Sequence, residues 1–229
     1  MTVPAIPSPK IDQQAYTGLS EKQLAGIGFI ALSWSGVEMG LSALIWDLAG
    51  MKSEIGRLVT TDLGNVSKAT LFQNLVHQTI NEPRLFAECE DLIFLYDHLR
   101  VQRNSTIHGI VKWGPSDDDG SFLVKESAKG GKGRVSQTVI DVSLETLDQL
   151  GADMVLCSEA IRQIYNKIWN FKFFYRAHLK SDPTTASDFV HRNTESSDQI
   201  VRLQTRLAGL YPKRHAQRSN QHPHPPLLR

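Results

Sequence analysis

Apolar residues recur at spacings of three and four near the start of the chain and predict a long amphipathic helix. Ser20 precedes this repeat as a suitable helix cap, and Gly50 follows it as a suitable helix end. We therefore predict a helix over about 20–49. Its core-facing residues are Ile27, Ile30, Trp34, Val37, Leu41, Leu44 and Leu48.

Two further helices, and possible space for a short third one, are expected before residue 110. The less regular stretch 51–64 leaves room for a short helix, and 66–80 has helical periodicity. Pro83 stands at a natural first position of a third long helix over about 84–107. The core-facing residues of this helix are Leu85, Cys89, Leu92, Tyr96 and Leu99.

Between residues 110 and 142 the pattern changes to short β-branched and aromatic runs separated by turn-forming sequences. These runs predict two or three short antiparallel strands. Ser143 then caps another long helix over about 144–179. The apolar repeat of that helix is Leu147, Leu150, Met154, Cys157, Ile161, Ile164, Ile168 and Phe171. The predicted fold is mainly all-α, a helical bundle with a small inserted antiparallel β-hairpin.

The two ends of the chain differ from this central part. Residues 1–17 are predicted to form a flexible arm, and 18–182 to form the bundle with its strand insertion at 110–142. A weaker pattern at 183–208 predicts an accessory helix. The basic, Pro- and His-rich segment 209–229 is expected to be disordered.

Composition places the chain among soluble globular proteins. It has 229 residues and a net charge of +1. The basic excess lies in the tail, so binding of nucleic acid by the bundle requires a local patch. Cys89 and Cys157 fall within apolar helical patterns and are expected to be buried, reduced side chains. The first residues lack the apolar segment of a secretory signal, so we expect a cytoplasmic protein.

The stretch 24–51 is apolar enough to raise the question of a membrane span, since its only charges are Glu38 and Asp47. A spanning helix needs about 20 mainly apolar residues. Glu38 would then lie near the bilayer centre, where a carboxylate is costly. Because the large apolar residues also keep to one face, we favour a bundle helix and expect no membrane association.

The last turns of the helix over 84–107 carry polar residues at positions where the apolar repeat predicts a core residue. One step beyond Leu99, the core-facing stripe reaches Arg103. A charge there is costly unless it is paired, and such local conflicts often mark functional sites. Arg100, Asn104 and His108 form a second row at a spacing of four on a neighbouring face.

Two interpretations of this segment remain open. In the first, it simply ends the helix: His108 complements the helix dipole, and Gly109 stops the helix. In the second, it is an active site. A buried Arg103 requires a carboxylate, and we expect Glu38 to supply it because Glu38 is adjacent to the core-facing Val37. The alternative is that Glu38 faces solvent.

The sequence "RNSTIHG" at 103–109 resembles the Arg-polar-x-x-x-His motif of HEPN domains, helical bundles found in many bacterial toxins and defence proteins. The stretch "WSGVEMGLSALI" at 34–45 is similar to the opening helix of small bacterial HEPN-like proteins. The strand region at 110–142 departs from the simpler members. The resemblance implies a metal-independent endoribonuclease of a toxin or defence system, without a cofactor.

The resemblance also implies a role for each residue of the motif. His108 acts as general base on a ribose 2′-OH or as acid on the leaving oxygen. Arg103 stabilises charge on the phosphorane-like transition state, and Asn104 orients His108 or the phosphate. Arg100 and Glu38 support them.

The partners follow from the same resemblance. Positions 103 and 108 lie about 140° apart around a helix and do not converge easily on one phosphate. In the family two motifs meet across a dimer interface, so a homodimer is expected. RNA is the expected substrate, and an antitoxin or regulatory protein is a further expected partner.

Two loops carry weaker chemical signals. The sequence "KGGKGR" at 129–134 supplies Lys129, Lys132 and Arg134, which could contact an RNA backbone or simply form a solvated hairpin tip. The acidic run at 116–120 lacks further ligands, so we expect an exposed turn and no metal site.

A second function class remains open. The chain could instead be a non-catalytic helical dimer that binds a partner protein or a nucleotide. In that case Arg103 is buried against an acid and His108 is only a helix cap. An enzyme requires both side chains to face one solvent-accessible cleft.

Overall fold

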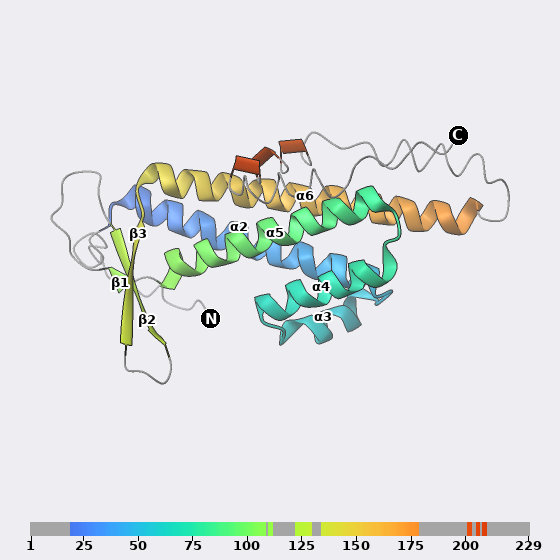
Figure 1. Ribbon diagram of the computed structural model, residues 1–229, viewed down its shortest axis with the longest axis horizontal. Helices are drawn as coiled ribbons and strands as arrows, with labels where there is room; N and C mark the ends of the chain where they lie inside the picture. Colours follow the sequence, from blue (N-terminus) through green and yellow to red (C-terminus); the bar gives the residue numbers. More distant parts are fainter. Residues whose placement is uncertain are drawn as a thin grey trace, which may run out of the picture. The chain divides into compact units, whose positions relative to one another are not determined.

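A computed structural model describes residues 19–108, 110–111, 122–129 and 134–178, together with 201–202, 205–206 and 208–209. Figure 1 shows that this part of the chain is mostly helical, which confirms the predicted mainly α-helical class. The predicted arm at 1–17 and most of the two C-terminal segments lie outside the described residues. The five helices are α2 (Glu21–Leu48), α3 (Ser53–Thr61), α4 (Asn65–Thr79), α5 (Pro83–His108) and α6 (Leu144–His178).

The ends of α2 are set by the residues that the sequence predicts. The backbone N–H of Ser20 donates to Gln23 Oε1 (2.9 Å), and the N–H of Gln23 donates to Ser20 Oγ (3.3 Å), which forms a capping box. At the other end Gly50 has a φ of 67°, and the N–H groups of Gly50 and Met51 donate back to carbonyls of the last turn. This is a Schellman motif, which requires the left-handed conformation that glycine adopts freely.

Between α5 and α6 the chain forms three strands: β1 (Ile110–Val111), β2 (Phe122–Lys129) and β3 (Arg134–Asp141). They pair antiparallel in the order β1-β2-β3. In the register of β2 and β3, Phe122 lies opposite Asp141 and Lys129 lies opposite Arg134. The sheet thus follows directly from the end of α5, where the candidate motif lies.

The chain divides into two compact units, and α2, α5 and α6 each contribute residues to both. The first unit comprises 1–32 and 102–151, and the second comprises 33–101 and 152–229. In the first unit, Gln23 Nε2 donates to the carbonyl of Val142 (3.0 Å), which links the start of α2 to the segment before α6. A Cβ added to Gly26 would lie 3.3 Å from Leu147, so α2 and α6 pack closely there.

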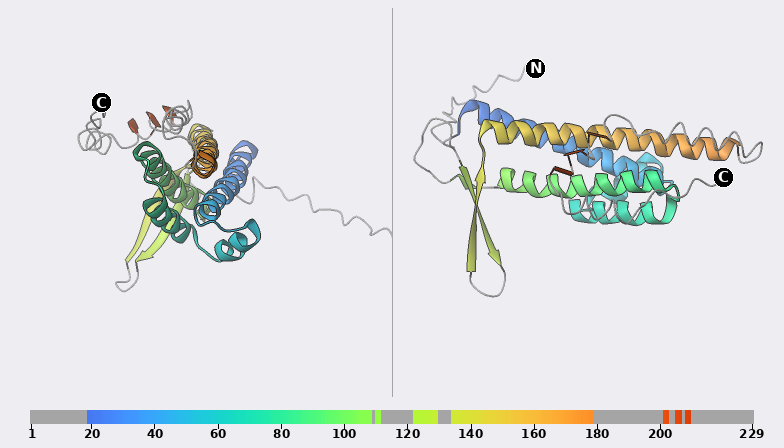
Figure 2. Two further views of the ribbon diagram at one scale, coloured as in Figure 1. Left: turned by 90° about the vertical axis from the view of Figure 1, so that its right-hand side faces the viewer. Right: turned by 45° about the horizontal axis from the view of Figure 1, so that its top comes forward.

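The core of the second unit is formed by α2, α5 and α6, which lie side by side in both views of Figure 2. The rings of Trp34 and Tyr96 join α2 to α5, with their centroids 5.0 Å apart. A Cβ on Gly40 would lie 2.8 Å from Ile161, so α2 and α6 are in close contact. The predicted core of α5 is confirmed, because Leu85, Cys89, Leu92, Tyr96 and Leu99 are all buried.

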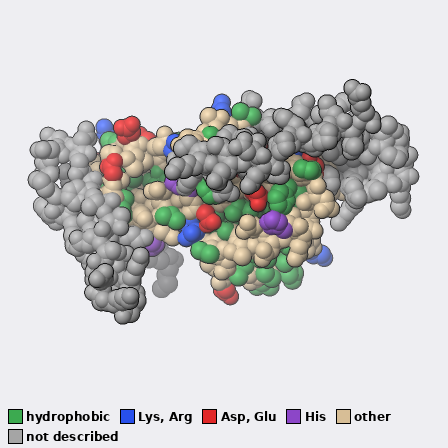
Figure 3. All heavy atoms as spheres, viewed as in Figure 1, with side chains coloured by type: hydrophobic (Ala, Val, Ile, Leu, Met, Phe, Trp, Pro, Cys, Tyr) green, Lys and Arg blue, Asp and Glu red, His purple; other side chains and the backbone are tan. Residues whose placement is uncertain are grey.

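Short helix α3 packs through its small residues and exposes its apolar ones. Gly56 and Thr60 are buried, whereas Ile55, Leu58 and Val59 are exposed, and Leu58 is 75% exposed. Figure 3 shows hydrophobic side chains along the lower edge of the molecule, where Figure 1 places α3 and α4. This face of α3 has apolar side chains in contact with solvent.

Helix α2 also has the length and hydropathy of a membrane-spanning helix, the only one that does so among the described helices. Core helices of soluble proteins share these two properties. In this helix Ile30, Trp34, Val37, Leu41, Leu44 and Leu48 are buried, as the bundle interpretation predicts.

Candidate functional site

The guanidinium of Arg103 is held by its neighbour in the sequence. Its Nη1 donates to Asn104 Oδ1 over 3.0 Å. The side chain is half-buried, and Nε is buried without a hydrogen-bond partner. Within the described residues of the first unit, no carboxylate lies within ion-pair distance of Arg103. The guanidinium therefore presents a fixed positive charge that the described residues of its own unit do not neutralise.

Thr106, and not Arg103, is the fully buried member of the motif region. It is 6% exposed, and its Oγ1 donates to the carbonyl of Gln102 (3.1 Å), a bond within the helix. The buried face of α5 therefore continues from Leu99 to Thr106, and the half-buried Arg103 lies beside it. A hydroxyl that bonds its own helix can be buried at low cost, which the repeat of large apolar residues did not indicate.

His108 is the last residue of α5, and it is exposed. Its position in the last turn is compatible with the interaction of a cation with the helix dipole and also with access to a ligand. Since α5 is a continuous α-helix from Pro83, Arg103 and His108 project about 140° apart. One copy of this helix does not direct both side chains at the same atom.

The two supporting residues lie in the second unit. Arg100 Nε donates to Asp97 Oδ1 (3.1 Å), and these two side chains are 23% and 48% exposed. Such a pair contributes little to stability. Glu38 is half-buried and lines a pocket of that unit. The expected pair of Glu38 with Arg103 would join the two units, and it stays a prediction.

The basic residues of the predicted hairpin tip are described only by their backbone. Lys129 ends β2 and Arg134 begins β3, directly opposite each other in the register. Lys132 and Gly109 lie outside the described residues. Contact of this tip with RNA therefore stays a prediction.

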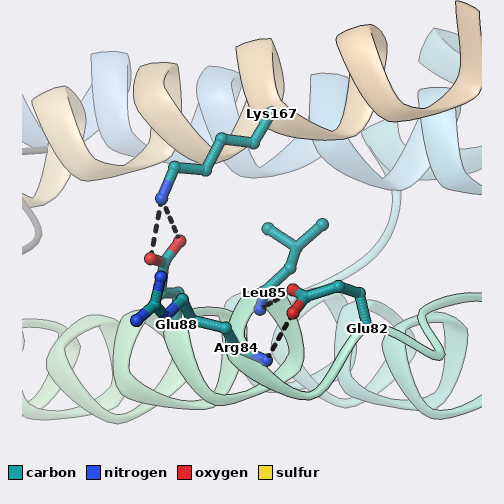
Figure 4. Close-up of polar contacts among 5 residues, drawn as sticks. All are labelled: Glu82, Arg84, Leu85, Glu88 and Lys167. Carbon is teal, nitrogen blue, oxygen red and sulfur yellow. Dashed lines mark hydrogen bonds and ion pairs between the residues drawn. The ribbon is translucent and has the colours of Figure 1, made fainter. Parts of the chain in front are cut away.

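Sequence reasoning missed a buried ion pair within the second unit. Lys167 Nζ contacts both carboxylate oxygens of Glu88 at 2.7 Å, and the two side chains are 11% and 1% exposed (Figure 4). Burial raises the pKa of Glu88, although the bond from Lys167 and its charge oppose this shift. Figure 4 also shows the Glu82 carboxylate capping the start of α5 at the N–H groups of Arg84 and Leu85.

A second missed ion pair joins Arg206 to Asp153 on α6. Arg206 donates from Nε and Nη2 to both oxygens of Asp153, at 2.7 to 3.1 Å. The Asp153 side chain is 7% exposed. Neither pair has a signal in the sequence, because the partners are 79 and 53 positions apart.

Both cysteines are buried and free, as expected, and burial raises their thiol pKa values. They are therefore poor nucleophiles. In the part of the chain that the structure describes, no three His, Cys, Asp or Glu side chains gather in a way that could hold a metal ion.

The end of α5 thus presents a guanidinium oriented by an amide, with an exposed imidazole about one turn further on. Comparison with known proteins adds no family: the chain matches no family model, no curated protein and no solved structure.

Proposed function

We propose that this chain is a HEPN-like, metal-independent endoribonuclease, with a small antiparallel hairpin inserted in its helical bundle at 110–142. The observation that carries the proposal is the state of Arg103. Its guanidinium is oriented by Asn104, partly enclosed, and without a carboxylate partner among the described residues of its own unit. A partly desolvated guanidinium of this kind favours binding of a phosphate, which accepts two parallel hydrogen bonds from it.

The proposed reaction is transesterification within the RNA chain. The ribose 2′-oxygen bonds to the adjacent phosphorus and loses its proton to His108, while the bond from that phosphorus to the 5′-oxygen of the next nucleotide breaks and the leaving oxygen takes a proton from water. The products are a 2′,3′-cyclic phosphate and a free 5′-hydroxyl. Arg103 stabilises the negative charge that develops on the phosphoryl oxygens.

A homodimer completes this site in the proposal. Because Arg103 and His108 diverge on one helix, the arginine of one copy and the histidine of the other would act on the same phosphate. The basic residues Lys129, Lys132 and Arg134 would bind the RNA backbone outside the reacting bond. We further propose a cytoplasmic toxin or defence role, in which an antitoxin or regulatory protein restrains the activity.

The experiment is cleavage of a mixed RNA pool by the purified full-length protein in the presence of EDTA. We expect products with 2′,3′-cyclic phosphate ends, and loss of at least about a hundredfold in rate for His108→Ala and for Arg103→Ala. Arg162→Ala is the matched control, because Arg162 is an exposed arginine on α6, outside the motif. It should cleave at the wild-type rate.

A competing function is a non-catalytic helical dimer that binds a protein or a nucleotide. The exposure of His108 at the end of α5 is compatible with this alternative, since a histidine there also stabilises the helix end. Absence of cleavage in every RNA pool, with both variants as stable as wild type, would support it and refute the ribonuclease. Equal cleavage by wild type and both variants would show a contaminating nuclease.

A further inference from the structure

A pocket of about 210 Å³ lies in the second unit, between α2 and the helices α3 and α4. Pockets for drug-sized ligands measure about 300–1,000 Å³, so this one suits a smaller molecule. It is separate from the Arg103 motif, which belongs to the first unit. Its lining includes Glu38, Met39 and Ser42 from α2, Arg57 and Thr61 from α3, and Lys68 from α4.

One wall of the pocket is rigid because Trp46 fixes α3 against α2. The indole is 8% exposed, and its Nε1 donates to Thr60 Oγ1 (3.0 Å). A Cβ on Gly56 would lie only 2.3 Å from Cγ of Trp46, so the backbone of α3 rests directly on the ring. The polar residues around the pocket are thus held on preformed helices, which lowers the entropic cost of binding a ligand.

Charges of both signs line this pocket. Glu38 comes from α2, whereas Arg57 and Lys68 come from α3 and α4. Within the residues that the structure describes, none of the three has an ion-pair partner within 4.0 Å. The carboxylate and the two cations therefore lie too far apart to neutralise each other, but close enough to line one small pocket.

Two hydroxyl groups beside these charges donate their hydrogens within their own helices and are available to a ligand as acceptors. Ser42 Oγ donates its hydrogen to the carbonyl of Glu38 (2.9 Å), and Thr61 Oγ1 donates to the carbonyl of Arg57 (2.6 Å). Their oxygen lone pairs remain available. The α2 side of the pocket thus accepts hydrogen bonds through Glu38 and Ser42, while Arg57 and Lys68 donate them.

From this charge pattern we infer that the pocket binds a free α-amino acid. The ammonium group of the ligand contacts Glu38 and Ser42, and its carboxylate contacts Arg57 and Lys68. A zwitterion satisfies both sets at once, whereas a simple anion leaves Glu38 unpaired and repelled. Met39, which is 57% exposed, and Trp46 provide apolar surface for the ligand side chain. This inference does not depend on the ribonuclease proposal.

The test measures thermal unfolding of the full-length protein with each of the twenty standard amino acids, added singly at millimolar concentration. A ligand that binds only the folded state raises Tm in a saturable way. We expect at least one amino acid to do so. Its N-acetyl derivative, which lacks the positive charge, and its amide, which lacks the negative charge, should each bind at least about tenfold more weakly.

Variants of the pocket residues test whether the amino acid binds at this pocket. Glu38→Gln and Arg57→Gln should each weaken binding at least about tenfold, and Lys68→Gln provides a third variant if one of the others fails to fold. Glu159→Gln and Arg162→Gln, on α6, are the controls and should bind as wild type does. The inference is overturned if no amino acid gives a saturable shift, if the derivatives bind equally well, or if the pocket variants bind unchanged.

Discussion

Helix α5 carries one enclosed charge near each of its ends, and the two charges differ in their surroundings. Near the start of the helix, Glu88 is 1% exposed and both its oxygens bind Lys167. Near the end, Arg103 is half-buried, and among the described residues of its unit the Asn104 amide is its hydrogen-bond partner and its Nε has none. The first charge is part of the folded core. The second is positioned but not neutralised by the described residues of its own unit, which is the state expected of a group that binds an external anion.

The largest effect on stability is expected from Lys167→Met. This variant leaves the Glu88 carboxylate buried without its cation, which costs about 3–5 kcal/mol. Urea unfolding followed by circular dichroism measures the loss. Arg162→Met, which removes an exposed charge from the same helix, should change the free energy of unfolding by less than about 0.5 kcal/mol.

The double variant Glu88→Leu/Lys167→Met distinguishes two causes of this loss of stability. One is the unpaired carboxylate of Glu88, and the other is the missing attraction between the two charges. Well-packed apolar residues often replace a buried ion pair without loss, so the double variant should recover most of the stability. If it is as unstable as Lys167→Met alone, the pair acts through packing, and the contrast with Arg103 loses its basis.

A smaller loss is expected from Arg206→Ala. This variant removes the two-pronged contact to Asp153, and hydrogen bonds to a charged group contribute about 1.5–3 kcal/mol. The effect should be below that of Lys167→Met, because the Arg206 side chain is 32% exposed and water can replace it. Arg202→Ala, one turn away and exposed, is the control. Equal unfolding midpoints for the two variants would contradict the structural role of Arg206.

The ion pairs Glu88–Lys167 and Asp153–Arg206 could not be predicted from the sequence. Apolar periodicity predicted α2, α5 and α6, their caps at Ser20 and Ser143, and the burial of residues such as Tyr96. Periodicity reports which face of a helix is buried, but it does not report which distant side chain lies opposite. The partners of Glu88 and Asp153 are therefore not readable from the pattern.

The candidate site shows the same limit. The pattern selected Arg103 because a charge stood where an apolar residue was due. It did not reveal that Thr106 would fill the buried position instead, because a threonine whose hydroxyl bonds its own helix has no distinctive spacing. Nor did it reveal the pocket with Arg57 and Lys68, since basic residues on helices are common in any sequence.

A still smaller effect, with a distinct pH dependence, is expected at the start of α6. The N–H of Ser143 donates to Asp141 (2.8 Å), and this bond and one from Thr146 hold the pKa of the Asp141 carboxyl below its usual value near 3.8. Asp141→Ala should cost about 0.5–1 kcal/mol at neutral pH. Asp148→Ala, an exposed aspartate further along α6, is the control.

The pH dependence follows from the lowered pKa. The folded protein holds the Asp141 proton more weakly than the unfolded chain, so ionised Asp141 stabilises the fold above the unfolded pKa, and this contribution disappears as pH falls through the folded pKa. The difference between wild type and Asp141→Ala should therefore shrink below about pH 4. A difference that is constant from pH 7 to pH 3 would show that Asp141 acts without its charge.

The smallest effect on stability is expected from Arg103→Met, and it is the decisive one for the comparison. Methionine keeps most of the side-chain volume and removes a half-buried charge that has no acid partner among the described residues of its own unit. Since removal of an unneutralised charge also removes its desolvation cost, the free energy of unfolding should stay within about 0.5 kcal/mol of wild type or rise. RNA cleavage, in contrast, should be lost. A loss of several kcal/mol, like that of Lys167→Met, would mean that Arg103 is held by a partner in the folded protein and is, like Glu88, a structural charge. The two ends of α5 would then differ only in degree, and the ribonuclease proposal would lose the observation that carries it.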